Sequence, residues 1–241
     1  MTKCIPLFII ILLISACKKD PVTERVEFTE TEYQTGTYDS TGRPSNLLAK
    51  DTVSAGIQTY IATTLPEKSD LRTTNPELLT TKAIADIAVT QPSDIFITFV
   101  FQRTNVENAV AFYTYPTTNP PASAKDIKNI TYIFPNAGKG TKLQAGDKVN
   151  IGRFNAGTSV GFVLMQDAWD PTTRTLNNEA VHFCSNDVLN PEVDPNLKKH
   201  AVLINYPSEG KVLIGFEDID RTDPKCDHDF NDVVIYATVK Q

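Results

Sequence analysis

The sequence predicts an all-β protein, an antiparallel two-sheet sandwich of jelly-roll-like type with about ten strands and one short N-terminal helix. From residue 84 onward, short runs rich in Val, Ile, Phe, Tyr and Thr recur along the chain. Pro, Asn, Asp and Gly separate these runs, as they separate strands. A parallel α/β sheet would need helices between the strands, and the sequence has no helical pattern there. The expected strands are residues 84–89, 95–101, 109–115, 127–134, 148–154, 159–166, 180–184, 201–206, 211–216 and 233–239.

The first residues have the pattern of an export signal. Lys3 provides a basic start, and residues 5–14 are apolar but far fewer than the roughly 20 that span a bilayer as a helix. Ile14-Ser15-Ala16-Cys17 resembles the lipobox of bacterial lipoproteins. The resemblance implies cleavage after residue 16, diacylglycerol on the Cys17 sulfur and fatty-acyl chains such as palmitate on the new amino terminus. The alternative is an ordinary secretory signal with a chance cysteine.

We therefore expect a protein of the cell envelope that lipid on Cys17 attaches to a membrane, most simply the outer membrane. Lys18-Lys19-Asp20 is similar to the tags of some surface lipoproteins of Bacteroidetes, but the sequence leaves open whether the protein faces the periplasm or the exterior. Removing residues 1–16 from 241 leaves 225 residues, and the loss of Lys3 changes the formal charge from −6 to −7. This negative charge, without clusters of Lys or Arg, argues against a nucleic-acid partner.

The mature chain divides at about residue 50. Residues 17–50 are rich in Thr, Glu, Ser and Asp with little apolar periodicity, which predicts a lipidated, flexible tether. Residues 51–241 form the expected single β-sandwich domain. Val53, Ile57, Ile61 and Leu65 recur at helical spacing and predict one helix within residues 53–65. Gly157 and Gly210 end two short polar segments, 155–157 and 208–210, that are typical of hairpin connections.

The richest concentration of acidic residues lies between the last two expected strands. Residues 217–232 contain seven carboxylates, and only Arg221 and Lys225 oppose them. Since both ends of the segment join strands, folding brings like charges together, and a cation would relieve their repulsion. Calcium fits best, because it takes six to eight oxygens from carboxylates, amides and carbonyls. The candidate ligands are Glu217, Asp218, Asp220, Asp227, Asp229, Asn231 and Asp232.

Two observations limit this interpretation. Asp227, Asp229 and Asn231 alternate as in the first half of an EF-hand loop, yet Asp232 stands where that loop needs Gly and Thr238 where it needs Glu. A calcium site would therefore borrow ligands across the loop. The alternative is a solvated acidic hairpin whose side chains cap backbone groups.

The acidic segment also carries a family resemblance. Gly215-Phe216-Glu217-Asp218, a polar loop, and Asp227-x-Asp229-Phe230-Asn231-Asp232-Val233-Val234 resemble the end of a bacterial secreted or surface domain family of unknown function that occurs in LruC-type lipoproteins. Residues 75–79, 111–116, 133–136, 143–149 and 200–203 agree with it, so the resemblance covers about residues 65–241. It implies an all-β extracytoplasmic module in which the acidic motif has a calcium role. Asp223-Pro224-Lys225-Cys226 departs from the glycine-rich sequence frequent in relatives.

The two cysteines that remain after lipidation suggest a cross-link. Cys184 and Cys226 form a disulfide candidate, because exported proteins fold in oxidising surroundings. Each cysteine also lies two residues from a histidine, His182 or His228, so a His2Cys2 zinc site is the alternative.

No catalytic motif emerges from the sequence. It has no nucleophile elbow, phosphate-binding glycine loop or His-Glu-x-x-His motif, so we expect a binding, adhesion or structural module rather than an enzyme. One alternative is a carbohydrate-binding lipoprotein in glycan capture, with Trp169 in the polar loop 167–178 as its ligand-binding candidate. The partner would then be a glycan or a surface protein. A third interpretation is a glycoside hydrolase that uses two of the many carboxylates. The other interpretation of Trp169 is that its side chain plugs the end of the sandwich.

Overall fold

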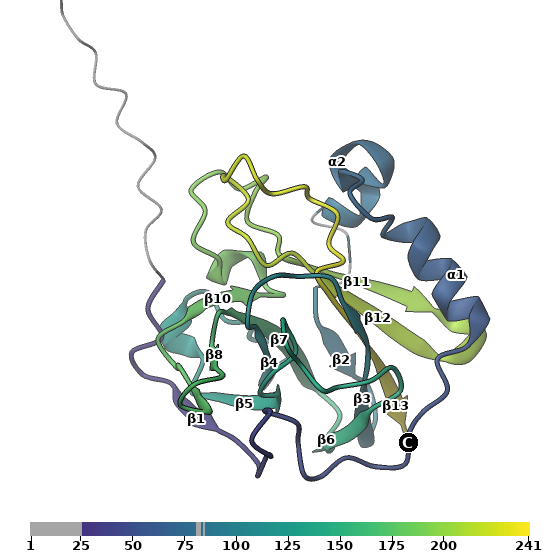
Figure 1. Cartoon of the computed structure of the whole chain (residues 1–241), viewed down its shortest axis with the longest axis vertical. Coiled ribbons are helices and arrows are strands. Elements are labelled where there is room, and N and C mark those ends of the chain that lie inside the picture. The colour runs from purple at the N-terminus through teal and green to yellow at the C-terminus, as the bar shows by residue number, and fades with distance from the viewer. Residues whose placement is uncertain (1–25, 81–82, 84) are drawn as a thin grey trace, which may run out of the picture.

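The computed structural model describes residues 26–80, 83 and 85–241. In these residues two main sheets pack face to face (Figure 1). The first sheet has the order β1 (Glu32–Gln34), β5 (Asn129–Phe134), β4 (Ala109–Pro116), β7 (Thr158–Gln166) and β10 (Val181–Cys184), and β2 (Ile87–Val89) also pairs with β7. The second has the order β11 (Ala201–Tyr206), β12 (Lys211–Phe216), β13 (Val233–Lys240), β3 (Ser93–Gln102) and β6 (Lys148–Phe154). A ribbon of β8 (Trp169–Asp170) and β9 (Thr175–Leu176) completes the described strands.

This arrangement confirms the predicted sandwich. Every strand pairing in the described chain is antiparallel except that of β1 with β5. The ten expected strands correspond to β2–β7 and β10–β13, and β6, β11 and β12 agree with the expected ranges at both ends. The additional strands β1, β8 and β9 have only two or three residues each, too few for a period-two pattern to be recognised.

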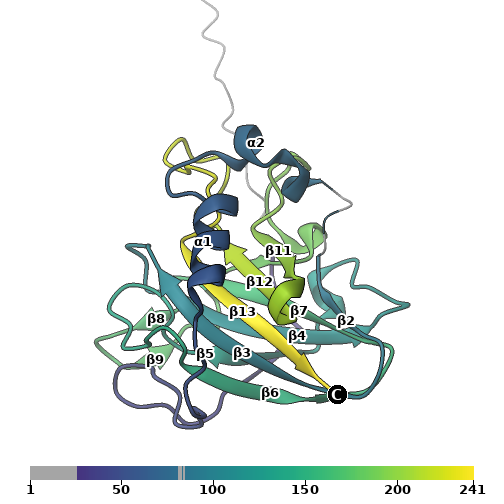
Figure 2. The same cartoon turned by 90° about the vertical axis from the view of Figure 1, so that its right-hand side faces the viewer.

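Apolar residues on the last strands face both sides of the second sheet. Val233 and Ile235 of β13 belong to the core between the two sheets, whereas Val234 and Tyr236 face the opposite side. Helix α1 (Ala55–Thr64), α2 (Leu71–Thr74) and the 3-10 helix η1 (Pro76–Leu79) supply the apolar side chains that cover this outer face (Figure 2). The sequence of β13 is almost continuously apolar, and this allows both faces of the strand to be buried.

Helix α1 confirms the expected helix and follows from its own sequence. The Ser54 side chain accepts a hydrogen bond from the Ile57 backbone N–H at 3.1 Å and caps the first turn. Ile57 and Ile61, one turn apart, are buried against the sheet. The helix ends before Leu65, which precedes Pro66, in agreement with the restriction that proline imposes on the residue before it.

Residues 26–50 differ from the flexible tether that the sequence predicts. Strand β1 pairs with β5, and Phe28 is buried in the apolar cluster on the outer face of the first sheet. Arg43 forms an ion pair with the buried Asp147, with 3.1 Å between Nη2 and Oδ2. The composition of this segment is polar because few of its side chains enter the core, but those few attach it to the sandwich.

The two expected hairpin connections have different outcomes. The 3-10 helix η4 (Pro207–Glu209) and Gly210, at φ +61°, join the paired strands β11 and β12. Residues 155–157 instead carry the chain from β6 in the second sheet to β7 in the first, so they do not form a hairpin. Two further 3-10 helices, η2 (Ala124–Asp126) and η3 (Asp187–Leu189), lie in connections.

The expected signal and lipidation site lie outside the described residues, since the description begins at Val26. Among the residues described, none of the helices has the length and apolar character needed to cross a bilayer.

Candidate functional site

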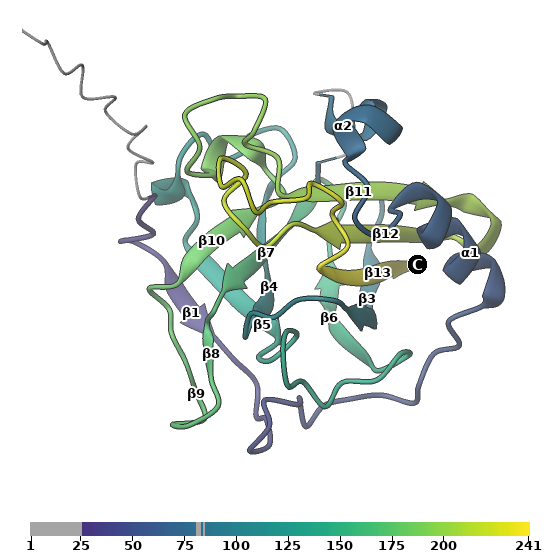
Figure 3. The ribbon, with the colours of Figure 1, turned by 45° about the horizontal axis from the view of Figure 1, so that its top comes forward.

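The acidic loop, residues 217–232, begins and ends at neighbouring strands. Phe216 at the end of β12 pairs with Val233 at the start of β13, and the Asp232 N–H donates to the Phe216 carbonyl at 3.1 Å. Glu217 and Asp232 are therefore held side by side although they are far apart along the loop. The loop lies beside residues 190–200, where the Arg221 guanidinium donates to the Lys199 carbonyl at 3.0 Å (Figure 3).

Glu217 is the central carboxylate of this loop. Its side chain is 1% exposed, and its Oε2 atom has no hydrogen-bond partner. Burial, followed by the charge of Asp227, raises the pKa of Glu217 to about 7. A buried carboxylate oxygen without a donor is costly unless a proton or a cation compensates it.

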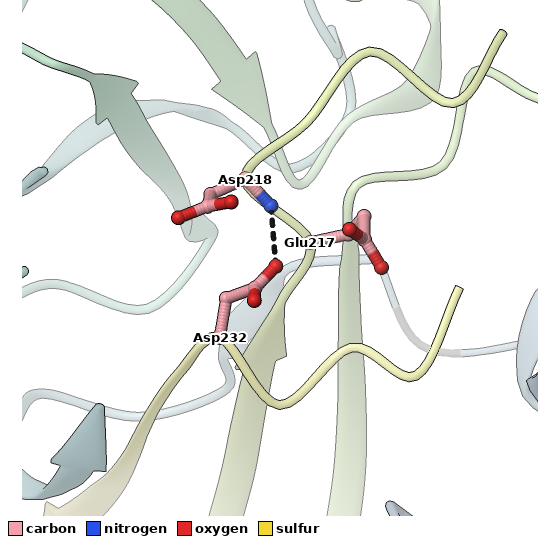
Figure 4. A group of neighbouring side chains, drawn as sticks. All are labelled: Glu217, Asp218 and Asp232. Atoms are coloured by element: carbon pink, nitrogen blue, oxygen red, sulfur yellow. Dashed lines mark hydrogen bonds between the residues drawn. The ribbon is translucent and has the colours of Figure 1, made fainter. Parts of the chain in front are cut away.

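Asp218 and Asp232 lie next to Glu217 (Figure 4). The Asp218 N–H donates to Asp232 Oδ2 at 2.9 Å, and the Asp218 carboxylate accepts hydrogen bonds from Thr104 and Asn108. Burial, followed by the charges of Asp218 and Glu217, raises the pKa of Asp232 to about 10. Without a cation, this arrangement holds protons at neutral pH.

The second half of the loop is fixed to the end of α1. Asp229 accepts hydrogen bonds from the Lys68 N–H at 2.7 Å and the Asn231 N–H at 3.0 Å, and the Asn231 amide donates to the Leu65 carbonyl at 3.1 Å. His228 and Phe230 have φ values of +59° and +57°, a conformation that is uncommon for residues other than glycine. The two residues with positive φ therefore lie between Asp227 and Asp229 and between Asp229 and Asn231.

The first residue of the Gly-Phe-Glu-Asp motif, Gly215, lies where the backbone of the acidic loop approaches β12 closely. A Cβ atom at this position would lie 2.4 Å from the Phe230 carbonyl oxygen and 2.6 Å from Leu65 Cδ1. Phe230 is fully buried in the cluster beneath α1 and packs against the Arg221 guanidinium. The glycine is thus required where the returning loop crosses β12 at close range.

The structure brings most of the predicted ligands together in two groups. Each group has three carboxylates whose ligand atoms lie within 4.8 Å of one another: Glu217, Asp218 and Asp232 in one, and Glu217, Asp227 and Asp229 in the other. Such spacing suits a calcium ion, whose ligand oxygens lie about 2.3–2.6 Å from the metal. Asp220 belongs to neither group, and its carboxylate caps Thr222 through hydrogen bonds of 2.7 and 2.8 Å.

The predicted disulfide is wrong for this structure, in which both cysteines are free and buried. Cys184 lies in the cluster on the outer face of the first sheet, whereas Cys226 lies in the acidic loop, 3.1 Å from His228 Nδ1. The predicted zinc alternative is also unsupported, because no metal-ligand group among the described residues contains a histidine or cysteine.

The prediction that Trp169 contacts a ligand is wrong as well. Trp169 is 2% exposed and packs edge-on against Tyr38, with 5.6 Å between ring centroids. Trp169 lies on β8. Strands β8 and β9 pair with each other, so the expected polar loop 167–178 contains a short antiparallel ribbon. The side chain is therefore buried and is not available to stack on a sugar.

Several residues around the acidic loop are not recognisable from sequence. Thr104, Asn108 and Lys68 contact its carboxylates, and they come from segments that precede it by more than 100 residues. Glu192 and His200 form a fully buried pair, with 2.5 Å between Oε1 and Nε2, and the Arg221 N–H is directed toward the same carboxylate. No local motif marks these contacts, since they depend on loop packing.

A cavity of about 490 Å³ lies beside β10 and is lined by residues from 26–33, from β10 and from the acidic loop. Its lining includes Phe28, Tyr33, Val181, Pro191 and Asp220. This volume is within the range of small-molecule sites.

Comparison with known proteins supports the family resemblance in the C-terminal part of the chain. Residues 154–240 match the model of a family described as a domain of unknown function, DUF4114. No curated protein and no solved structure gives a match. The matched region contains the whole acidic loop and the strands on both sides of it. Over residues 154–240, the chain is therefore similar to a domain family of unknown function.

Proposed function

We propose that this protein is a lipid-anchored β-sandwich module of the cell envelope that calcium stabilises and that has a binding, adhesion or structural role. The observation that carries the proposal is the Glu217 carboxylate, which is buried with one unpartnered oxygen among four other carboxylates. An ionised carboxylate that is buried without compensation costs free energy, and a bound cation would offset that cost.

Calcium at this position would act as a cross-link within the domain. The candidate ligands lie at the junction of β12 with β13, and hydrogen bonds connect them to the end of α1 and to residues 104–108. Neutralising the carboxylates would remove their repulsion and hold the three segments together. Calcium would thus stabilise β13, the strand that joins β12 to β3.

Thermal unfolding of residues 18–241, which include every described element, tests the calcium role. Calcium at about one hundred times its dissociation constant adds roughly 2.7 kcal/mol if it binds only the folded state. For a chain of this length, that is about 5–10 °C in Tm relative to EDTA. Asp229→Asn should reduce the increase, because Asp229 belongs to one of the two carboxylate groups. Asp223→Asn is the matched control, because Asp223 lies in the same loop outside both carboxylate groups. Equal melts in calcium and EDTA would remove the proposal.

The proposed anchor has an independent test. Cells supplied with an alkyne analogue of palmitate should label the wild-type protein and not Cys17→Ser. Labelling of both proteins, or of neither, would contradict lipidation at Cys17 while leaving the calcium experiment unaffected.

Glycan capture is the second candidate function, and the cavity beside β10 is the observation that favours it. The Tyr33 ring lines this cavity and could stack on a sugar. A glycan array should then show binding that Tyr33→Ala removes. Tyr60→Ala is the control, because Tyr60 packs against Tyr206 on the other sheet. No bound glycan on a broad array would exclude this function.

A further inference from the structure

The two carboxylate groups of the acidic loop share one residue, Glu217. We call Glu217, Asp218 and Asp232 the inner group, and Glu217, Asp227 and Asp229 the outer group. We propose that Glu217 bridges two divalent cations, one held by each group. This inference rests on the proposed calcium function and specifies the number of ions and their ligands.

A single ion cannot contact all five carboxylates. Two oxygens bound to one calcium ion are at most about 5 Å apart, because each lies about 2.3–2.6 Å from the metal. Within the described residues, the groups that meet this spacing each contain three residues. One ion in the inner group leaves Asp229, which is 2% exposed, and one in the outer group leaves Asp218, which is 1% exposed. Either choice keeps a buried carboxylate without a metal ion.

Two ions balance the charge of the site. The groups together contain five carboxylates, and the Arg221 guanidinium, 2% exposed, is the buried cation of the same loop. Two divalent ions and one guanidinium carry five positive charges. One ion would leave two negative charges in excess in a largely water-excluded site.

The unpartnered oxygen of Glu217 points to a ligand independently of the carboxylate spacing. Oε2 is the one Glu217 oxygen that is both buried and without a hydrogen bond. By contrast, Asp218 has Thr104 and Asn108 as donors, and Asp229 has the N–H groups of Lys68 and Asn231. The residue shared by the two groups is therefore the one with a buried carboxylate oxygen that accepts no hydrogen bond.

The two positions differ in their access to solvent. Thr104 and Asn108 close the inner group, and Asn108 is fully buried. Asp227 in the outer group is exposed. The outer ion would keep water in part of its coordination shell and exchange more readily, so the two ions should bind with different affinities.

Equilibrium dialysis of calcium against residues 18–241 measures the number of ions directly. We expect two ions per chain for the wild type and for the control Asp223→Asn. Asp227→Asn should lose the outer ion and Asp218→Asn the inner ion, so each variant should retain one. Glu217→Gln should weaken both. Asp227 is exposed, so its variant remains informative if a buried substitution prevents folding, which far-UV circular dichroism would reveal.

Stoichiometry separates failure of this inference from failure of the proposed function. One ion per wild-type chain, together with a higher Tm in calcium, would overturn the bridged pair and leave calcium stabilisation intact. No bound calcium and no change in Tm would overturn both. Loss of both ions in Asp227→Asn, with the fold preserved, would also contradict two separately held positions.

Discussion

Glu217→Gln should have opposite effects with and without calcium. Glutamine keeps the size of the side chain and removes its negative charge, so it relieves repulsion in the calcium-free protein and removes a metal ligand in the calcium-bound one. At pH 8 in EDTA the variant should therefore be more stable than the wild type. In excess calcium it should be less stable, because the wild type alone retains the complete ligand set.

The pKa of Glu217 sets the size of the first effect. Folding raises this pKa from 4.5 to about 7, and each unit corresponds to about 1.36 kcal/mol, so ionised Glu217 destabilises the calcium-free fold by roughly 3 kcal/mol. The gain from glutamine is smaller, because a buried amide also needs hydrogen-bond partners. An increase of a few degrees and at most about 12 °C in Tm is expected for residues 18–241.

The raised pKa of Glu217 also predicts how the stability of the calcium-free protein changes with pH. Because folding raises the pKa, folded Glu217 keeps its proton at pH values at which the unfolded chain has lost it. Its contribution to stability is fully present below about pH 4.5 and declines until the pH passes about 7. Wild type and variant should consequently differ little at pH 4.5 and most at pH 8.

Differential scanning fluorimetry in EDTA at both pH values, with circular dichroism as a second probe, measures this difference. Asp223→Asn controls for the general loss of a negative charge from the loop. Equal Tm differences between Glu217→Gln and wild type at pH 4.5 and pH 8 would refute the claim that burial of an ionised Glu217 destabilises the protein.

Three further perturbations test the packing around the site. Gly215→Ala should unfold or strongly destabilise the loop because its Cβ would meet the Phe230 carbonyl at 2.4 Å, and a wild-type Tm would refute this close contact. Trp169→Ala should lower the free energy of unfolding, measured in urea, by about 3–5 kcal/mol, because Trp169 is buried. An exposed Trp that stacks on sugars would show a much smaller loss. Residues 51–241 should melt below residues 18–241, because β1, Phe28 and Arg43 contact the sandwich; identical melts would support the flexible tether instead.

Local patterning accounts for most of the fold prediction. Strands such as β6, β11 and β12 agree with their expected ranges because short apolar runs end at turn-forming residues, and these signals are local. The pairing partners are not local. The segment 155–157 has a glycine suitable for a hairpin, yet it joins strands in different sheets. Strand β6 pairs with β3 in the second sheet, and β7 pairs with β4 in the first.

The predictions for Trp169 and for the Cys184–Cys226 disulfide failed because they depend on how each side chain is buried. Trp169 suggests a sugar contact only if its ring is exposed, and Cys184 suggests a disulfide only if Cys226 lies beside it in a chain that is exported as the sequence predicts. The structure buries Trp169 beneath Tyr38 and places Cys184 and Cys226 in different parts of the molecule. The sequence left burial of Trp169 open as an alternative and could not decide either outcome, since nearby residues in the sequence do not determine which surface will cover a side chain.

The acidic loop shows both contributions. Its sequence alone established the density of carboxylates, their position between two strands and the oxygen-rich chemistry that suits calcium, because composition and strand periodicity are properties of the chain itself. The tertiary structure decided that Asp220 lies outside the cluster, that Glu217 joins its two halves, and that Thr104, Asn108 and Lys68 hold its carboxylates. Those contacts arise between segments more than 100 residues apart, and only the packing of the two sheets and of the helical layer brings these segments within hydrogen-bonding distance.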